Sequence, residues 1–502
     1  MNYQSTRNHR LQASSAAAVL EGIAADGGLY IRDDLSTMNF DWKGLLGEDS
    51  LTMSARILSA LLPDIPDMET LVKQGYEGKF ETDELTPLAQ VGDRYVLELF
   101  RGPTSAFKDV ALSLLPRLIT SAKTVCGVDD EIVILTATSG DTGKAALEGF
   151  KGVDGVSIGV LFPDGGVSDI QRKQMVTTTG DNVQVWAVRG NFDDCQTGVK
   201  HAFADEKFAE KLLDEYRIAL SSANSINWGR LLPQVVYYIS SYAELVAAGK
   251  IEAGCPIDVC VPTGNFGNIL AAWYAKQIGV PIERLLCASN DNRVLTDFIN
   301  TGTYDISDRE FILTSSPSMD ILVSSNLERQ LFELTGRNGE AIRQWMADLA
   351  DARCFRVDAE TFRRVRENFS ADSVDNATCL ATIREVLDAH DYLLDPHTAV
   401  AYAAAQNLRG ENPVLIASTA HWAKFGNNVY RAIHGIEPSG ELPADVAALT
   451  GCELNKLIAE ETGKHHIPAG LANLDTMQVR FTEVIDNDVE AIEDAAEAFL
   501  TR

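Results

Sequence analysis

Three short segments between residues 101 and 268 contain side chains that could together bind a phosphorylated aldehyde. The first carries Lys108, between Phe107 and Asp109, at the predicted start of an apolar helix. Burial and the positive end of a helix both disfavour an ammonium ion, so we expect a lowered pKa and an amine able to react with an aldehyde. A single lysine is more often an exposed cation, so this hypothesis depends on the other two segments.

Those two segments, residues 138–143 and 262–268, each follow an apolar strand and precede a predicted helix. Unpaired backbone N–H groups and the helix dipole make such turns suitable for anions. In the second turn, Gly264 and Gly267 allow close approach of a phosphate, and Asn265 and Asn268 supply neutral donors. The alternative is an ordinary tight turn between strand and helix.

A phosphate-binding loop of the nucleotide triphosphatases is excluded for residues 138–144. The pair Gly143-Lys144 resembles the end of that motif, but Thr138 replaces its first glycine. Ala145 stands where the magnesium-binding serine or threonine belongs. Magnesium-dependent nucleotide binding is therefore not expected.

Two further polar segments could complete the site. Asn224, Ser225 and Arg230 follow another strand, and an arginine beside a hydroxyl and an amide can bind a second phosphate or a carboxylate; a surface ion pair is the alternative. Ser418 and Thr419 end a late apolar strand and could face a pyridine nitrogen. The ordered set predicts a pyridoxal 5'-phosphate site, whereas His397 and His421 could equally be structural.

The composition is that of a globular protein with several domains. The 502 residues are 45% hydrophobic and 23% charged, and the formal net charge is −29. Such acidity excludes nucleic acid as a partner and requires a locally positive pocket for any small anionic substrate. The eight cysteines lack metal or disulfide spacing, and no window is apolar enough to span a bilayer, so we expect a cytoplasmic protein without structural metal.

The pattern along the chain predicts an α/β fold with open parallel sheets flanked by helices. Apolar runs at 131–135, 156–162, 183–186, 257–261 and 414–416 alternate with helical stretches, which is typical of strands buried between helix layers. We predict an amino-terminal domain over residues 1–85, a catalytic core over 86–435 with a helical insertion at about 295–395, and a carboxy-terminal helical segment over 436–502.

With these residues in place, the chain resembles the threonine synthases, specifically the long form, within the fold-type II (tryptophan synthase β-like) pyridoxal phosphate enzymes. The likeness covers nearly the whole chain. It rests on the segments above and on Ser5-Thr6-Arg7, Asp26-Gly27-Gly28-Leu29-Tyr30, Ser316-Pro317-Ser318-Met319-Asp320-Ile321, Ser325-Asn326-Leu327-Glu328-Arg329, Asp395-Pro396-His397-Thr398-Ala399 and Ser418-Thr419-Ala420-His421 with Ala423-Lys424-Phe425.

The resemblance implies conversion of O-phospho-L-homoserine and water to L-threonine and phosphate, the last step of threonine biosynthesis, by a monomer or homodimer. Lys108 would bind the cofactor aldehyde and then move the substrate protons. The other roles are implied by motif. Gly264, Asn265, Phe266, Gly267 and Asn268 would bind the cofactor phosphate, Ser418 or Thr419 the pyridine nitrogen, Ser139 and Thr142 the substrate carboxylate, and Asn224, Ser225 and Arg230 the leaving phosphate.

Asp141 is also implied as a cofactor-binding residue, where many relatives have an asparagine that donates to the ring oxygen. An ionised aspartate cannot donate, so its partner must differ or it must be protonated. Two other functions stay open at this stage. One is a dehydratase or cysteine synthase on the same fold, which needs no second phosphate site, and the other is a catalytically silent binding protein.

Overall fold

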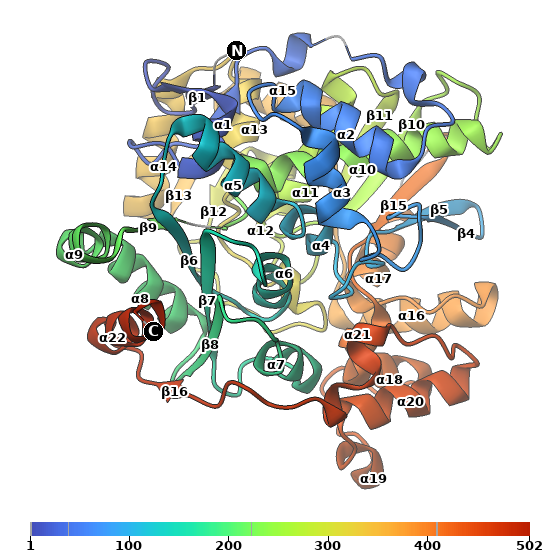
Figure 1. Cartoon of the computed structure of the whole chain (residues 1–502). Helices are drawn as coiled ribbons and strands as arrows, with labels where there is room; N and C mark the ends of the chain where they lie inside the picture. The colour runs from blue at the N-terminus through green and yellow to red at the C-terminus, as the bar shows by residue number, and fades with distance from the viewer. Residues whose placement is uncertain (1–2, 39, 222, 408–409, 502) are drawn as a thin grey trace.

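Two sheets flanked by helices form the centre of the computed structural model, which describes residues 3–38, 40–221, 223–407 and 410–501 (Figure 1). The α/β fold class predicted from the sequence is confirmed. Among the described residues, no helix is both long enough and apolar enough to cross a bilayer.

The first sheet has five parallel strands in the order β16-β8-β7-β6-β9. Its strands are β6 (Glu131–Ala137), β7 (Val156–Pro163), β8 (Val183–Val188), β9 (Ile218–Ser221) and β16 (Val484–Ile485). Every residue of β7 and β8 is buried, as expected for strands covered on both faces. Helices α6 (Asp141–Phe150) and α7 (Asp169–Val176) cover one face, and α8 (Phe192–Ala204) and α9 (Glu206–Tyr216) cover the other (Figure 1).

The second sheet has six strands in the order β14-β11-β10-β15-β5-β4, and only β4 and β5 pair antiparallel. Its strands are β4 (Leu88–Val91), β5 (Arg94–Glu98), β10 (Ile257–Pro262), β11 (Ile282–Ser289), β14 (Phe369–Ser373) and β15 (Val414–Ser418). Successive side chains of β10 point to opposite faces of this sheet. Val259 therefore packs toward α10 (Trp228–Ala247) and α11 (Gly267–Gln277). Cys260 packs toward α16 (Asn376–His390) and α17 (Pro396–Ala405).

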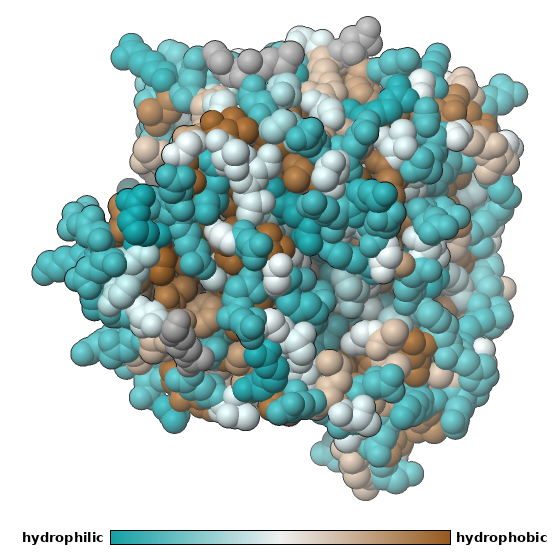
Figure 2. Space-filling view, in the orientation of Figure 1, coloured by the Kyte–Doolittle hydropathy of each residue, from teal (hydrophilic) through white to brown (hydrophobic). Residues whose placement is uncertain are grey.

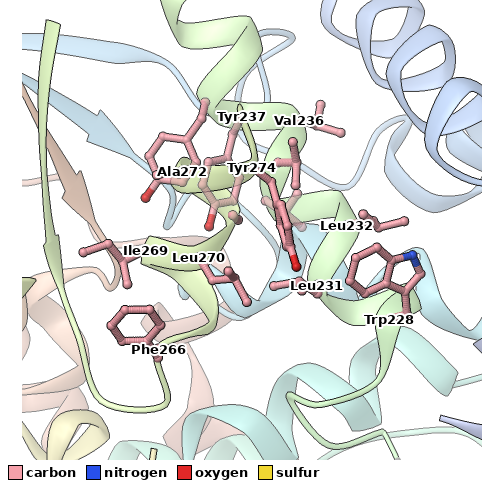
Figure 3. Packing of buried hydrophobic residues seen from close by; sticks show 14 of the residues in the cluster. Trp228, Leu231, Leu232, Val236, Tyr237, Phe266, Ile269, Leu270, Ala272 and Tyr274 are labelled. Atoms are coloured by element: carbon pink, nitrogen blue, oxygen red, sulfur yellow. The ribbon is translucent and has the colours of Figure 1, made fainter. Parts of the chain in front are cut away.

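Helices α10 and α11 pack tightly against each other on one face of the second sheet and support the glycine turn of the site. Leu231, Leu232 and Val236 of α10 meet Ile269 and Leu270 of α11 in one buried cluster (Figure 3). Because Phe266 also lies in this cluster, the glycine turn that precedes α11 is anchored in the core.

The amino-terminal part consists of a small antiparallel sheet and helices that lie against α10. Strands β1 (Tyr3–Ser5), β2 (Gln12–Ala13) and β3 (Tyr30–Arg32) form the sheet. Its helices are α1 (Ser15–Glu21), α2 (Ser50–Leu61) and α3 (Met68–Tyr76), of which α1 and α2 contact α10 and α3 packs on α2; α4 (Lys108–Leu112) and α5 (Leu115–Cys126) follow in the core. Ser14 caps α1 by accepting from the backbone N–H of Ala17, so the apolar run near the amino end is a capped helix.

The stretch expected to be a helical insertion contains strands that the sequence pattern did not predict. Its helices are α12 (Val294–Thr301), α13 (Leu327–Leu334), α14 (Gly339–Ala352), α15 (Ala359–Asn368) and α16. Strands β12 (Thr303–Asp305) and β13 (Cys354–Arg356), far apart in the sequence, form a two-stranded antiparallel sheet, and β14 joins the central sheet beside β11. These strands are short and half-polar, so nothing in their sequence distinguishes them from loops.

The carboxy-terminal part begins with a cluster of helices and ends at the first, five-stranded sheet. Its helices are α18 (Gly426–His434), α19 (Ala444–Ala447), α20 (Gly451–Thr462), α21 (Ala469–Ala472) and α22 (Val489–Leu500). The chain then crosses the molecule, so that β16 pairs with β8 and α22 packs on α8 (Figure 1). The segment is therefore helical except for β16, which adds an edge strand to the first sheet.

The face of the molecule seen in Figure 2 is mostly polar. Hydrophilic residues cover most of the face seen in Figure 2, and apolar patches there are small and scattered. All eight cysteines are free thiols, as the spacing predicted.

Candidate active site

The predicted segments meet at the carboxyl ends of β6, β10 and β15. The turn before Lys108 contacts the end of β15, because Ala106 and Ala420 form an antiparallel bridge and the N–H of His421 donates to the carbonyl oxygen of Ser105 (3.1 Å). Side chains at this edge of parallel sheets converge on one crevice, which is where such folds bind ligands.

Asp109 shapes the turn that presents Lys108. Its carboxylate accepts from the N–H of Thr104 at 2.8 Å and from the Thr104 hydroxyl. A Cβ on Gly102 would lie 2.4 Å from Cβ of Asp109, so only glycine allows this turn to close. Burial raises the pKa of Asp109 to about 6, although its bonds to Thr104 oppose the shift.

Lys108 lies at the first position of α4 with its side chain 10% exposed. Its Nζ is 3.5 Å from Oδ2 of Asp141 and 4.9 Å from the centroid of the Phe107 ring. Burial lowers the pKa of Lys108, while Asp141 partly opposes the shift. The side chain thus has the lowered basicity expected from the sequence, and it points into the crevice.

The partner of Asp141 is a second lysine, Lys424, which the sequence analysis did not assign to the site. Its Nζ lies 2.8 Å from Oδ1 of Asp141. Gln171 donates to the same oxygen (2.8 Å), and the Ser318 hydroxyl donates to Oδ2 (3.2 Å). Burial by itself raises the pKa of Asp141, but Lys424 and Lys108 outweigh it and hold the pKa well below its usual value. Asp141 is therefore an ionised acceptor and not a protonated donor.

The loop before α6 opens onto a cavity of about 250 Å³. Gly140 has φ +133°, and a Cβ there would lie 2.4 Å from Cδ of Gln171, so glycine lets Gln171 reach Asp141. Ser139 is exposed and lines the cavity together with Gln171, Lys424 and Arg431. Ser139 thus lines the same cavity as Gln171 and Lys424, the two residues that contact Oδ1 of Asp141.

The glycine turn before α11 is held by the segment that precedes α13. Ser324 donates to the carbonyl oxygen of Gly264 (2.6 Å), and the N–H of Asn326 donates to the carbonyl oxygen of Asn265 (3.1 Å). Tyr238 donates to Oδ1 of Asn268, but Nδ2 of this buried side chain has no hydrogen-bond partner among the described residues. An unpaired amide donor at a helix start fits a phosphate group.

Arg230 is buried near the start of α10 and contacts Thr142. Its Nη2 lies 3.4 Å from Oγ1 of Thr142, and its Nη1 donates to the carbonyl oxygen of Ala223 (2.8 Å). Within the described ranges, no carboxylate lies within ion-pair distance of Arg230, and burial lowers its pKa to about 10. A buried guanidinium without a carboxylate fits an anionic ligand, so the alternative of a surface ion pair is wrong.

Asn224 and Ser225 lie in the loop that leads to Arg230. The Ser225 hydroxyl donates to Oδ1 of Asn224 (3.1 Å), and Nδ2 of Asn326 donates to the carbonyl oxygen of Ser225 (3.2 Å). Arg329 binds the carbonyl of Ile226, so α13 braces this loop as well as the glycine turn. Asn326 and Arg329 belong to a segment quoted for the resemblance, but no local pattern in that segment predicts this bracing role.

Ser418 and Thr419 differ in how their hydroxyl groups are used. Thr398 donates to Asp395, so the Ser418 hydroxyl must donate to Thr398 (2.9 Å). In the part of the chain that the structure describes, the Thr419 hydroxyl makes no such bond to a side chain. Ser418 is thus committed to a structural chain of hydrogen bonds, and Thr419 is the one left to face the crevice.

Both histidines make hydrogen bonds to neighbouring parts of the chain. His397 accepts from the N–H of Ser318 at Nε2 (3.0 Å), which places its proton on Nδ1, 2.7 Å from Asp395. His421 accepts from the N–H of Ala423 (3.2 Å), and burial holds its pKa well below the ordinary value. His397 nevertheless matters for the site because it positions Ser318, which donates to Asp141.

The residues present fit pyridoxal phosphate. Lys108 is a buried amine of lowered basicity, and the amide Nδ2 of Asn268 has no partner among the described residues. Ser105 adds a buried hydroxyl that has no partner among the described residues either. Such unsatisfied buried groups are costly unless a ligand pairs with them.

Three family models match the chain. "Threonine synthase N terminus" matches residues 2–76, "Pyridoxal-phosphate dependent enzyme" matches 83–419 and "Threonine synthase, C-terminal" matches 398–495. The second covers more than half of the chain, which agrees with the cofactor predicted from the sequence.

Individual proteins agree with these matches. "Threonine synthase-like 1" of Macaca fascicularis is 41% identical over 83% of this chain, but the aligned part spans only 57% of that protein. The threonine synthase of Pseudomonas aeruginosa is 38% identical over 89% of this chain and 93% of its own length. The crystal structure of the threonine synthase from Brucella melitensis with bound pyridoxal phosphate has a TM-score of 0.87 and 37% identity, with both chains fully covered. This chain belongs to the threonine synthase family of pyridoxal-phosphate-dependent enzymes.

Proposed function

We propose that the protein is a lyase that converts O-phospho-L-homoserine and water to L-threonine and phosphate. The observation that carries this proposal is that one site contains both a buried amine, Lys108, and a buried guanidinium, Arg230, which has no carboxylate partner among the described residues. The first suits an aldehyde cofactor and the second suits the phosphate of the substrate. A dehydratase or cysteine synthase acts on a substrate without this phosphate and would not need the Arg230 guanidinium.

Bound pyridoxal phosphate supplies an electron sink for the substrate carbons. The chain would hold it through Lys108 at the aldehyde, through residues 264–268 at the phosphate and through Thr419 at the pyridine nitrogen. Ser418 is the weaker candidate for the nitrogen, because its hydroxyl donates to Thr398. Asp141, held as an anion by Lys424, would accept a hydrogen bond from a group beside Lys108.

The substrate would lie between α6 and α10. Ser139 and Thr142 would bind its carboxylate, and Arg230 with Asn224 and Ser225 would bind its phosphate. Once released from the aldehyde, Lys108 would take the proton from Cα and return protons along the substrate chain, because burial lowers its pKa and favours the neutral amine that a base requires. Holding both ends of the substrate aligns Cα with this amine.

The surroundings of the site support the remaining expectations. Eight free thiols suit a reducing compartment such as the cytoplasm, and an acidic surface does not suit nucleic acid. Arg230, whose guanidinium has no carboxylate partner among the described residues, supplies the local positive charge that an anionic substrate needs inside an acidic protein. We propose a monomer or homodimer that acts on a small molecule.

The test is a coupled assay of phosphate release and threonine formation from phosphohomoserine, with and without added cofactor. Hydride trapping and peptide mapping should find the cofactor on Lys108, and Lys108→Ala should abolish both products. Lys123→Ala is the matched control, because this buried lysine on α5 donates to the carbonyl oxygen of Gly155 (3.0 Å) and has no ion pair with a carboxylate among the described residues. Elimination from serine or threonine without phosphate release would instead identify a dehydratase. A colourless protein with no adduct would identify a silent binding protein.

A further inference from the structure

Two buried lysines share the two oxygens of Asp141. Lys424 Nζ lies 2.8 Å from Oδ1, and Lys108 Nζ lies 3.5 Å from Oδ2. Lys424 is fully buried, and its other hydrogen bond is to the carbonyl oxygen of Thr104 (2.9 Å). Over the described parts of the chain, Asp141 is the one carboxylate within ion-pair distance of Lys424.

One carboxylate compensates one positive charge. Every group that contacts Asp141 through a side chain is a donor, namely Lys424, Gln171, Ser318 and Lys108, so Asp141 is fully ionised. Lys424 makes the shorter contact and is the more deeply buried of the two lysines, so Lys424 and Asp141 form the neutral pair. An ammonium ion on Lys108 would then be a second, uncompensated buried charge.

We propose that Lys424 is a positioning residue that satisfies the charge of Asp141 and thereby keeps Lys108 available as a neutral amine for the cofactor aldehyde. The inference rests on the proposed function, since it assumes that Lys108 reacts with the aldehyde. Without Lys424, Lys108 would become the sole cation at Asp141, and Coulomb attraction would hold its proton more tightly.

Other charged or titratable groups face this pair and stay in place when Lys424 is changed. Arg230 of α10 acts on Lys108, and Asp109 of α4 and His421 lie within electrostatic reach of Lys424. His397 reaches Asp141 only through Ser318. Because these groups are common to all variants, a comparison of variants isolates the contribution of Lys424.

The experiment measures the rate at which the full-length, cofactor-free chain captures pyridoxal phosphate, followed by absorbance between about pH 6 and about pH 10. Capture requires the neutral amine, so the rate rises through the pKa of Lys108. Lys424→Met should move the midpoint upward by about one pH unit or more, and Lys424→Arg should restore it. Asp141→Asn should move it downward, since two cations then face each other.

The double variant Lys424→Met/Asp141→Asn separates the charge effect from packing. It removes both members of the neutral pair, so its midpoint should return toward that of the unaltered chain. Lys144→Met is the matched control, because Lys144 is a buried lysine on α6, paired with Glu148 at 3.0 Å, that makes no contact with Asp141. It should leave the midpoint unchanged.

The near-UV spectrum and the thermal midpoint show whether Lys424→Met is folded. If this variant is folded and the pH midpoint of cofactor capture is unchanged, the inference is overturned. An equal shift in the Asp141→Asn background would overturn it too, because the effect would then not pass through Asp141. If Lys424→Met does not fold, the Asp141→Asn arm decides, and an unchanged midpoint there counts against the inference. Absence of any adduct on Lys108 in the unaltered chain would instead refute the proposed function.

Discussion

The backbone N–H of Phe107 donates to the carbonyl oxygen of Thr419 over 2.8 Å. This bond places the end of β15 directly against the turn that carries Lys108. The residue that follows β15 is thereby fixed against the turn of Lys108, which comes much earlier in the chain.

The first prediction concerns the two hydroxyl residues at this junction. Thr419→Ala should change the absorbance spectrum of the bound cofactor and lower activity, because we propose that Thr419 faces the pyridine nitrogen. Ser418→Ala should instead lower the free energy of unfolding by about 1 kcal/mol, since it removes a buried hydrogen bond to Thr398. Spectra and denaturant unfolding of both variants check this, and a spectral change confined to Ser418→Ala would reverse the assignment.

The second prediction concerns Arg230. Arg230→Ala should lower kcat/KM for the phosphorylated substrate by roughly 10- to 100-fold, the range for loss of hydrogen bonds to a charged group. A phosphate-free amino acid should lose much less, since its contacts are elsewhere. Steady-state assays with both substrates measure the difference. Equal losses would place Arg230 outside the phosphate site.

The third prediction concerns the glycine turn. A Cβ at Gly267 would lie 3.2 Å from Nδ2 of Asn326, which in turn donates to the carbonyl of Ser225. Gly267→Ala should therefore be tolerated with a small shift of Asn326, whereas Gly267→Val should retain cofactor weakly, because it also blocks approach to the backbone. The ratio of cofactor to protein after gel filtration measures retention. Full occupancy in Gly267→Val would remove this turn from the site.

The fourth prediction concerns stability and pH. Burial raises the pKa of Glu244, on α10, to about 8, and nearby Glu84 adds to the shift. The folded chain thus holds this proton more tightly than the unfolded chain, so the stabilisation is complete below about pH 4.5 and is lost as the pH rises to about 8. Glu244→Gln should raise the free energy of unfolding at pH 8.5 by about 1 kcal/mol, a reduced figure because the side chain is partly exposed.

Thermal unfolding of Glu244→Gln at two pH values checks the sign. The gain should be clear at pH 8.5 and nearly absent at pH 4.5, where both chains carry a neutral side chain. A gain of the same size at both values would show that packing, and not titration, causes the change.

Much of the core could be predicted from local sequence patterns. The apolar runs of β6, β7, β8, β10 and β15 identified five strands of the two central sheets, because strands buried on both faces need continuous apolar residues. Residues 138–143 and 264–268 were identified by their glycines, since turns of this kind demand backbone freedom. Strands β11 and β14 were overlooked. Only their pairing with β10 and with each other defines them, and β14 carries mostly polar residues.

The sequence by itself determined that a lysine at a helix start and two anion-binding turns occur in one α/β chain. Only the tertiary structure decided which side chains complete the charge balance around that lysine. Nothing in the residues next to Lys424 predicts a buried ion pair. Its burial against Asp141 depends on how β15 docks beside α4 and α6. Local pattern fixes secondary structure, but the pairing of buried charges depends on contacts between segments far apart in the chain, which only the folded packing brings together.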